Sequence, residues 1–204
     1  MKRPYVICHM MTSVDGRIDC AMTEHLPGVQ EYYDTLAELD APSRVSGRVT
    51  AQLEMSLAGE FKAANSQPVG KEAFSKAVNA EGYEIVIDTM GTLLWEDDTN
   101  SRRPLLIVTS EKDRIDLKRA CEILSEEFGV ERMAVVGGGH INAGFLEAGL
   151  LDEVSILIGA GIDGRGGMAA VFDGLDMDRP VTPLKLTDVK KFPSDAVWLR
   201  YAVK

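Results

Sequence analysis

Three consecutive glycines, Gly137 to Gly139, stand between an apolar run and a stretch with helical spacing. Because glycine has no side chain, a turn built from it lets the backbone approach a ligand closely. The first-turn amides of a helix have no partner within the helix and therefore favour a phosphate or pyrophosphate. Residues 135–142 thus predict a phosphate-binding turn, with a plain tight turn between strand and helix as the alternative.

Other chemistries lack their residues in this chain. A Rossmann fingerprint needs G-x-G-x-x-G after the first strand and an acid about twenty residues later, whereas this glycine run lies two thirds along the sequence. Neither the P-loop pattern G-x-x-x-x-G-K-[ST] nor the zinc-deaminase elements H-x-E and P-C-x-x-C occur. We expect no metal, because no ligand spacing connects the histidines or cysteines, which are His9, His25, His140, Cys8, Cys20 and Cys121.

Composition is that of an ordinary globular protein, with 45% hydrophobic and 26% charged residues in 204. We expect a single domain over 1–204. The net charge of −10 opposes binding to nucleic acid, although local amides and one or two cations can still hold an anionic cofactor. Apolar stretches are strand-sized and the start has no signal-peptide pattern, so we expect a cytoplasmic protein with no membrane partner.

Apolar runs alternate with segments of helical spacing along most of the chain. The runs that predict strands are 4–11, 43–46, 83–88, 104–109, 132–136 and 152–158. The segments that predict helices are 28–40, 51–58, 114–128 and 140–148. This order is typical of an α/β fold with a largely parallel sheet and helices on both faces. Segments 184–192 and 196–203 predict a terminal antiparallel hairpin added to that sheet, and 59–70 reads as a surface connection.

Four segments in order carry a family resemblance that covers nearly the whole chain. They are 5–18, 47–50, 88–95 and 136–142, the last followed by 145–153. Together they resemble the reductase domain of the riboflavin-biosynthesis deaminase/reductase proteins and its stand-alone relatives. The resemblance implies a dihydrofolate-reductase-like fold, a homodimer, and an NADPH-dependent oxidoreductase that reduces the ribosyl group of a phosphorylated ribosylamino-pyrimidine to a ribityl chain.

The resemblance also assigns the cofactor site. The pyrophosphate would lie at the glycine turn and the start of the next helix, which comprise Gly137, Gly138, Gly139, His140, Ile141 and Asn142. A second helix start that faces a phosphate would include Gly47, Arg48 and Thr50, and the adenosine ribose would lie near Thr109 and Ser110. Donors for the 2′-phosphate of NADPH are Ser110, Lys112, Arg114 and Arg48, and simple surface solvation is the alternative for the basic residues.

On the substrate side, the resemblance places Asp15 beside the substrate and the nicotinamide, with Ser13 and Met10 as further substrate contacts. Hydride transfer to an open-chain imine or aldehyde also needs a proton, which Asp15, a neighbouring hydroxyl or water would supply. Asp15 precedes Gly16, so a turn-forming carboxylate is the alternative.

The chain also departs from the family. Many members have an acid immediately before two glycines, where this chain has Gly137, and the expected proline after Ile158 is missing. Two other functions therefore stay open. A dihydrofolate reductase would need a helix carboxylate facing a pterin, for which Asp34 and Glu38 are candidates. The second is a nucleotide-binding relative that does not catalyse a reaction.

Overall fold

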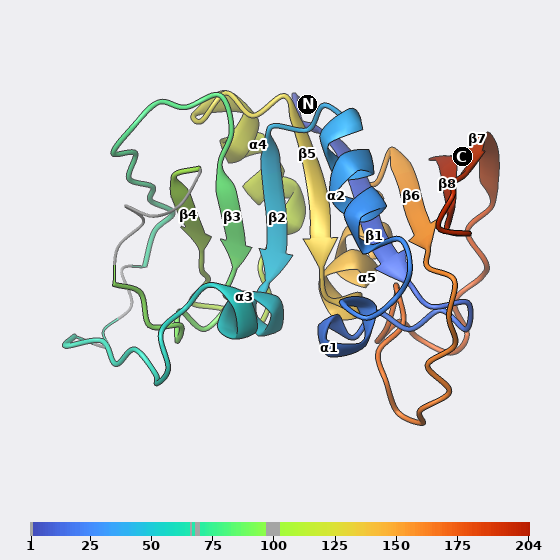
Figure 1. The fold of residues 1–204 in the computed structure, drawn as a ribbon. Coiled ribbons are helices and arrows are strands. Elements are labelled where there is room, and N and C mark those ends of the chain that lie inside the picture. The colour runs from blue at the N-terminus through green and yellow to red at the C-terminus, as the bar shows by residue number, and fades with distance from the viewer. Residues whose placement is uncertain (1, 66, 68–69, 97–102) are drawn as a thin grey trace.

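The computed structural model describes residues 2–65, 67, 70–96 and 103–204. Its strands form one eight-stranded sheet in the order β4-β3-β2-β5-β1-β6-β8-β7 (Figure 1). The strands are β1 (Tyr5–Thr12), β2 (Ser43–Gly47), β3 (Glu84–Ile87), β4 (Leu105–Val108), β5 (Arg132–Gly137), β6 (Glu153–Ile158), β7 (Leu184–Lys191) and β8 (Val197–Val203). Among the described residues, no helix is long and apolar enough to cross a membrane.

The six strands from β4 to β6 are all parallel, and β8 and β7 join the sheet antiparallel. The central strand β1 pairs with β5 and β6, so that Cys8 lies opposite both Val135 and Val154. These three positions are fully or almost fully buried, as expected of a parallel sheet covered on both faces. The prediction of a mostly parallel α/β sheet with an antiparallel terminal hairpin is confirmed.

The helices are α1 (Cys20–Thr23), α2 (Val29–Glu38), α3 (Arg48–Glu54), α4 (Leu117–Glu126) and α5 (Gly139–Glu147). Figure 1 shows α2 on one face of the sheet and α4 and α5 on the other. Two predicted helices had wrong bounds. The helix expected over 51–58 begins at Arg48, directly after the extended Gly47, and ends at Glu54. The helix expected from Arg114 begins later because the Asp116 side chain accepts a hydrogen bond from the Arg119 amide.

Side chains of β1 alternate between two cores. Val6 and Cys8 belong to a large cluster that includes α4 and α5, whereas Ile7 and Met11 pack toward Trp198 on the other face. The predicted connection 59–70 contains no helix or strand over 59–65, and positions 66, 68 and 69 lie outside the described residues. The polar segment predicted between β3 and β4 likewise includes residues outside the described ranges, at 97–102.

Candidate active site

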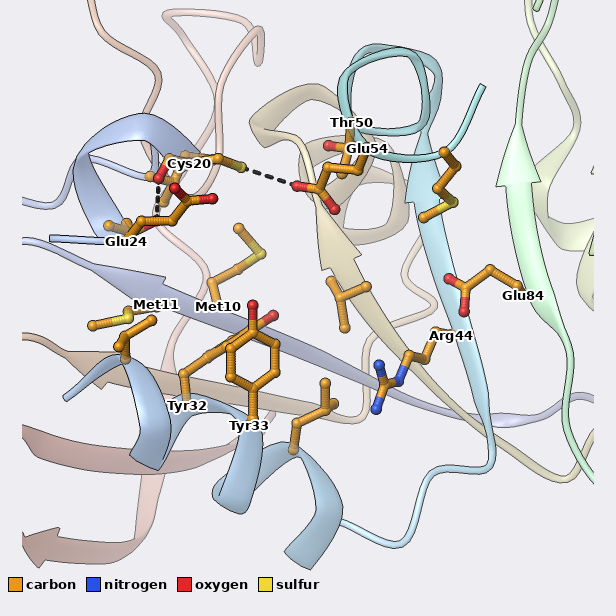
Figure 2. A pocket seen from close by; sticks show the side chains of 16 residues that line it. Met10, Met11, Cys20, Glu24, Tyr32, Tyr33, Arg44, Thr50, Glu54 and Glu84 are labelled. Atoms are coloured by element: carbon orange, nitrogen blue, oxygen red, sulfur yellow. Dashed lines mark hydrogen bonds between the residues drawn. The ribbon is translucent and has the colours of Figure 1, made fainter. Parts of the chain in front are cut away.

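A cleft of about 300 Å³ lies between α2 and α3 (Figure 2). Strands β1, β2, β3 and β5 contribute to its walls, and α1 borders one end. Its apolar lining is Met10, Met11, Ile18, Val29, Leu36, Met55 and Val136. Its polar lining is Cys20, Thr23, Glu24, Tyr32, Tyr33, Arg44, Thr50, Glu54 and Glu84. A hollow that combines apolar walls with polar groups is a usual form of a small-molecule site.

Thr50 connects this cleft to the glycine turn. A Cβ atom added to Gly137 would lie 2.7 Å from Thr50 Oγ1, so a side chain has no space there. Gly138 has a φ of 88°, which side chains rarely adopt, and a Cβ on Gly139 would lie 2.5 Å from the carbonyl oxygen of Ala170. Each glycine is therefore required by its own contact or backbone angle, and the turn directly adjoins the cleft.

The start of α5 has backbone donors without a hydrogen-bond partner among the described residues. Within the described ranges, the amides of Gly139, His140 and Ile141 donate no hydrogen bond, and the first amide of the helix that does so is that of Asn142, to the Gly138 carbonyl. The Asn142 side chain is buried and donates to the Val171 carbonyl at 2.8 Å, so it holds the neighbouring loop. The predicted turn thus has free amides, whereas the Asn142 side chain is structural.

The remaining predicted cofactor residues lie along the same edge of the sheet. Thr109 and Ser110 follow β4, three strands from β5, which corresponds to about 14 Å. Lys112 and Arg114 are exposed just beyond them. Arg48 is exposed at the start of α3 and donates to Gln52 Oε1 at 3.1 Å. Because parallel strands end at one edge, these groups and the glycine turn share it.

Asp15 holds two loops together. Its carboxylate accepts hydrogen bonds from Ser13 Oγ at 2.7 Å and from the amides of Asp163 and Gly164 at 3.0 Å. These bonds hold the pKa of the Asp15 carboxyl below its usual range, the Ser13 hydroxyl contributing most. Such a group is a poor proton donor near neutral pH. The geometry favours a positioning role over that of a general acid, and neither Asp15 nor Ser13 lines the cleft, whereas Met10 does.

The two helix carboxylates considered for pterin binding do not line the cleft. Asp34 is exposed and accepts a hydrogen bond from Gln30 at 3.0 Å. Glu38 is exposed and forms an ion pair with Lys190. The structure therefore gives neither of them the buried position on α2 that a dihydrofolate reductase would need.

Several residues of the cleft were not predicted. Arg44 and Glu84 occupy interior strands at positions where apolar side chains would be usual, and that anomaly was the available signal. Glu54 accepts a hydrogen bond from Cys20 Sγ at 3.2 Å, and burial together with this contact raises the pKa of Cys20 to about 12. Cys20 is consequently a neutral thiol near neutral pH. Figure 2 shows it at one end of the cleft, hydrogen-bonded to Glu54.

A parallel sheet with a glycine turn and a cleft at its strand ends defines an α/β protein with a site in the position typical of nucleotide-binding folds. The family follows from the sequence comparison. Residues 4–198 match the model of the RibD C-terminal domain, and the chain belongs to this family of riboflavin-biosynthesis pyrimidine reductase domains.

Individual relatives agree with this assignment. The chain is 25% identical over 196 residues, 90% of each sequence, to the 2,5-diamino-6-ribosylamino-4(3H)-pyrimidinone 5′-phosphate reductase of Methanothermobacter thermautotrophicus. A pyrimidine reductase-like protein of Corynebacterium diphtheriae has the same fold, with a TM-score of 0.71, 16% identity, and 98% and 92% of the two chains covered. Acinetobacter baumannii RibD gives a TM-score of 0.69 at 18% identity; 99% of this chain matches 58% of that one.

Proposed function

We propose that the protein is an NADPH-dependent reductase that transfers hydride to a ribosylamino-pyrimidine 5′-phosphate and converts its ribosyl group to a ribityl chain. Membership of the pyrimidine reductase family supports the reaction class. The name of the Methanothermobacter relative supports a phosphorylated ribosylamino-pyrimidine as the substrate.

One observation carries the proposal, which is the contact between Gly137 and Thr50. Thr50 lines the cleft, and Gly137 begins the turn whose amides are free. A dinucleotide whose pyrophosphate accepts hydrogen bonds from those amides can extend one arm toward Thr109 and Ser110 and the other into the cleft. The two ends of the cofactor would then meet the residues predicted for them.

The start of α5 fits a pyrophosphate, because the amides of its first turn are free to donate. When bound, the nicotinamide supplies the hydride. The protein orients the acceptor against Met10 and Thr50 and excludes water with the apolar wall of the cleft. Asp15, held ionised by its neighbours, fixes the loop after β1, and the proton needed by the reduced substrate comes from water or a hydroxyl group.

The test is NADPH oxidation followed at 340 nm with the 2,5-diamino substrate, its deaminated counterpart and dihydrofolate as a comparison. We expect turnover with one of the ribosylamino-pyrimidine phosphates, slower turnover with NADH, and none with dihydrofolate. A Gly139→Val variant should lose activity, because its side chain would strike the Ala170 carbonyl and displace the start of α5. Oxidation with dihydrofolate alone, or with no substrate, would refute the proposal.

We also propose that the protein forms a homodimer. The terminal strand β7 is an exposed sheet edge and carries the exposed apolar side chains of Leu184, Leu186 and Val189. Such an edge is a surface that proteins commonly pair or cover. Sedimentation equilibrium should give twice the mass of the chain, and a monomer at micromolar concentration would contradict this.

A further inference from the structure

Two opposite charges stand side by side on the floor of the cleft. Arg44 on β2 and Glu84 on β3 are Cα partners in the parallel register, so their side chains project from the same face of neighbouring strands. Figure 2 shows both directed toward the cleft, where Arg44 is the one basic residue among those that line it. The backbone register thus fixes a donor group beside an acceptor group.

These two side chains do not satisfy each other. The Nε atom of Arg44 is buried and has no hydrogen-bond partner, and within the part of the chain that the structure describes Arg44 and Glu84 form no ion pair. Burial raises the pKa of the Glu84 carboxyl, and the nearby Arg44 opposes that rise. No hydrogen bond among the described residues uses the outer guanidinium nitrogens of Arg44 or the carboxylate of Glu84, so these groups are available to a ligand that enters the cleft.

The pairing limits what that ligand can be. A phosphate would gain from Arg44 but be repelled by the carboxylate of Glu84, and a cation would meet the reverse. A neutral group that presents an acceptor next to a donor satisfies both. We propose that Arg44 and Glu84 together bind the lactam edge of a pyrimidinone ring, whose carbonyl oxygen accepts from the guanidinium group and whose adjacent ring N–H donates to the carboxylate.

The position agrees with the proposed reaction, on which this inference rests. Arg44 lies three residues before Gly47, about 10 Å along the strand from the edge where the hydride would arrive. A ribosylamino-pyrimidine bound by its lactam edge at Arg44 would therefore point its sugar toward Thr50. Leu36, Met55 and Val136 supply apolar walls for a flat ring.

Isothermal titration without cofactor tests the inference, using 2,5,6-triaminopyrimidin-4(3H)-one, its N3-methyl derivative, and pterin, which has the same edge on a bicyclic ring. Each is titrated into the unaltered protein and into the variants Arg44→Met and Glu84→Gln. Hydrogen bonds to charged groups make either variant bind the parent base at least about tenfold more weakly. Glu126→Gln, an exposed carboxylate on α4 on the other face of the sheet, should bind it normally.

The N3-methyl derivative gives the sharpest result, because it lacks the ring N–H. We expect it to bind the unaltered protein at least about tenfold more weakly than the parent base, with no further loss in Glu84→Gln. Equal binding of the two bases, no measurable binding of the parent base, or tighter binding of pterin would overturn the inference. If the base binds through both Arg44 and Glu84 but the protein does not oxidise NADPH, the inference about the lactam edge holds and the proposed reaction is refuted.

Discussion

The two faces of the sheet differ in what fills them. On the face covered by α4 and α5, side chains such as Val6, Met133 and Phe145 form one continuous apolar cluster. On the face of α2 and α3, the sheet presents Arg44 and Glu84 to a cleft. Close packing stabilises a fold, whereas a hollow with unsatisfied polar groups binds a ligand at some cost in stability. The cleft therefore occupies only part of the face of α2 and α3, beside the smaller core of Ile7, Met11 and Trp198.

The largest expected effect is on the packed face. Phe145 on α5 is 2% exposed within the large cluster, and Phe145→Ala should lower the free energy of unfolding by about 3–5 kcal/mol, measured by urea denaturation. The matched change on the other face is Met55→Ala, at a partly exposed side chain that lines the cleft, and it should cost less than about 1 kcal/mol. Equal losses from the two variants would contradict the comparison.

The free energy of unfolding should depend on pH through His9, which lies on the same face of the sheet as the cleft. Its ring is buried and stacked on Tyr32, and burial lowers its pKa to about 4. The unfolded chain takes up this proton near pH 6.5 and the folded chain only near pH 4, so stability falls as the pH is lowered through that window. The loss should reach about 3 kcal/mol.

Urea denaturation between pH 4 and pH 7 measures this loss. His9→Gln should remove most of the dependence, whereas the exposed His25, replaced in the same way, should leave it unchanged. A His9→Gln protein that keeps the full pH dependence would show that other groups cause it.

A smaller effect is expected where the glycine turn meets the cleft. Gly137→Ala places a Cβ against Thr50 and should cost about 1–3 kcal/mol of stability and weaken NADP⁺ binding. Adding Thr50→Ala removes Oγ1 and Cγ2, the two closest obstacles, and should restore part of the stability. Thermal melting measures the stability of both variants, and NADP⁺ titration measures their affinity for the cofactor. A Gly137→Ala protein with unchanged stability and unchanged NADP⁺ binding would refute the tight contact.

The smallest expected effect is that of Asp15→Asn. The variant weakens the bonds to the amides of Asp163 and Gly164, so turnover should fall several-fold while the melting temperature stays nearly constant. Because the pKa of Asp15 is lowered, the shape of the rate–pH profile should not change. If one limb of the profile disappears instead, Asp15 is the proton donor; an unaltered rate would exclude it from the mechanism.

The sequence predicted the elements better than the cleft. Strands such as β1 and β5 are visible as apolar runs, because a parallel strand that is buried on both faces needs apolar side chains along most of its length. The four-residue α1 was missed because it buries no side chain and so has no apolar pattern. The glycine turn could be predicted because only glycine fits its close contacts and the positive φ of Gly138.

The roles of the cleft residues were harder to predict from the sequence. Arg44 and Glu84 are forty residues apart, and only the register of β2 and β3 places them side by side. Asp15 accepts hydrogen bonds from amides almost 150 residues away, so the sequence supported a turn-forming role and a role beside the substrate equally and did not reveal the loop that Asp15 contacts. Contacts of this kind depend on tertiary structure, which local patterns do not encode.

Amide NMR spectra recorded during an NADP⁺ titration test the central claim most directly, which is that the first turn of α5 holds the cofactor pyrophosphate. The account predicts that the amide signals of Gly138, Gly139, His140 and Ile141 shift most and saturate together, with smaller shifts at Thr109 and Ser110. Saturation with these signals unmoved, and the largest shifts elsewhere in the chain, would contradict it.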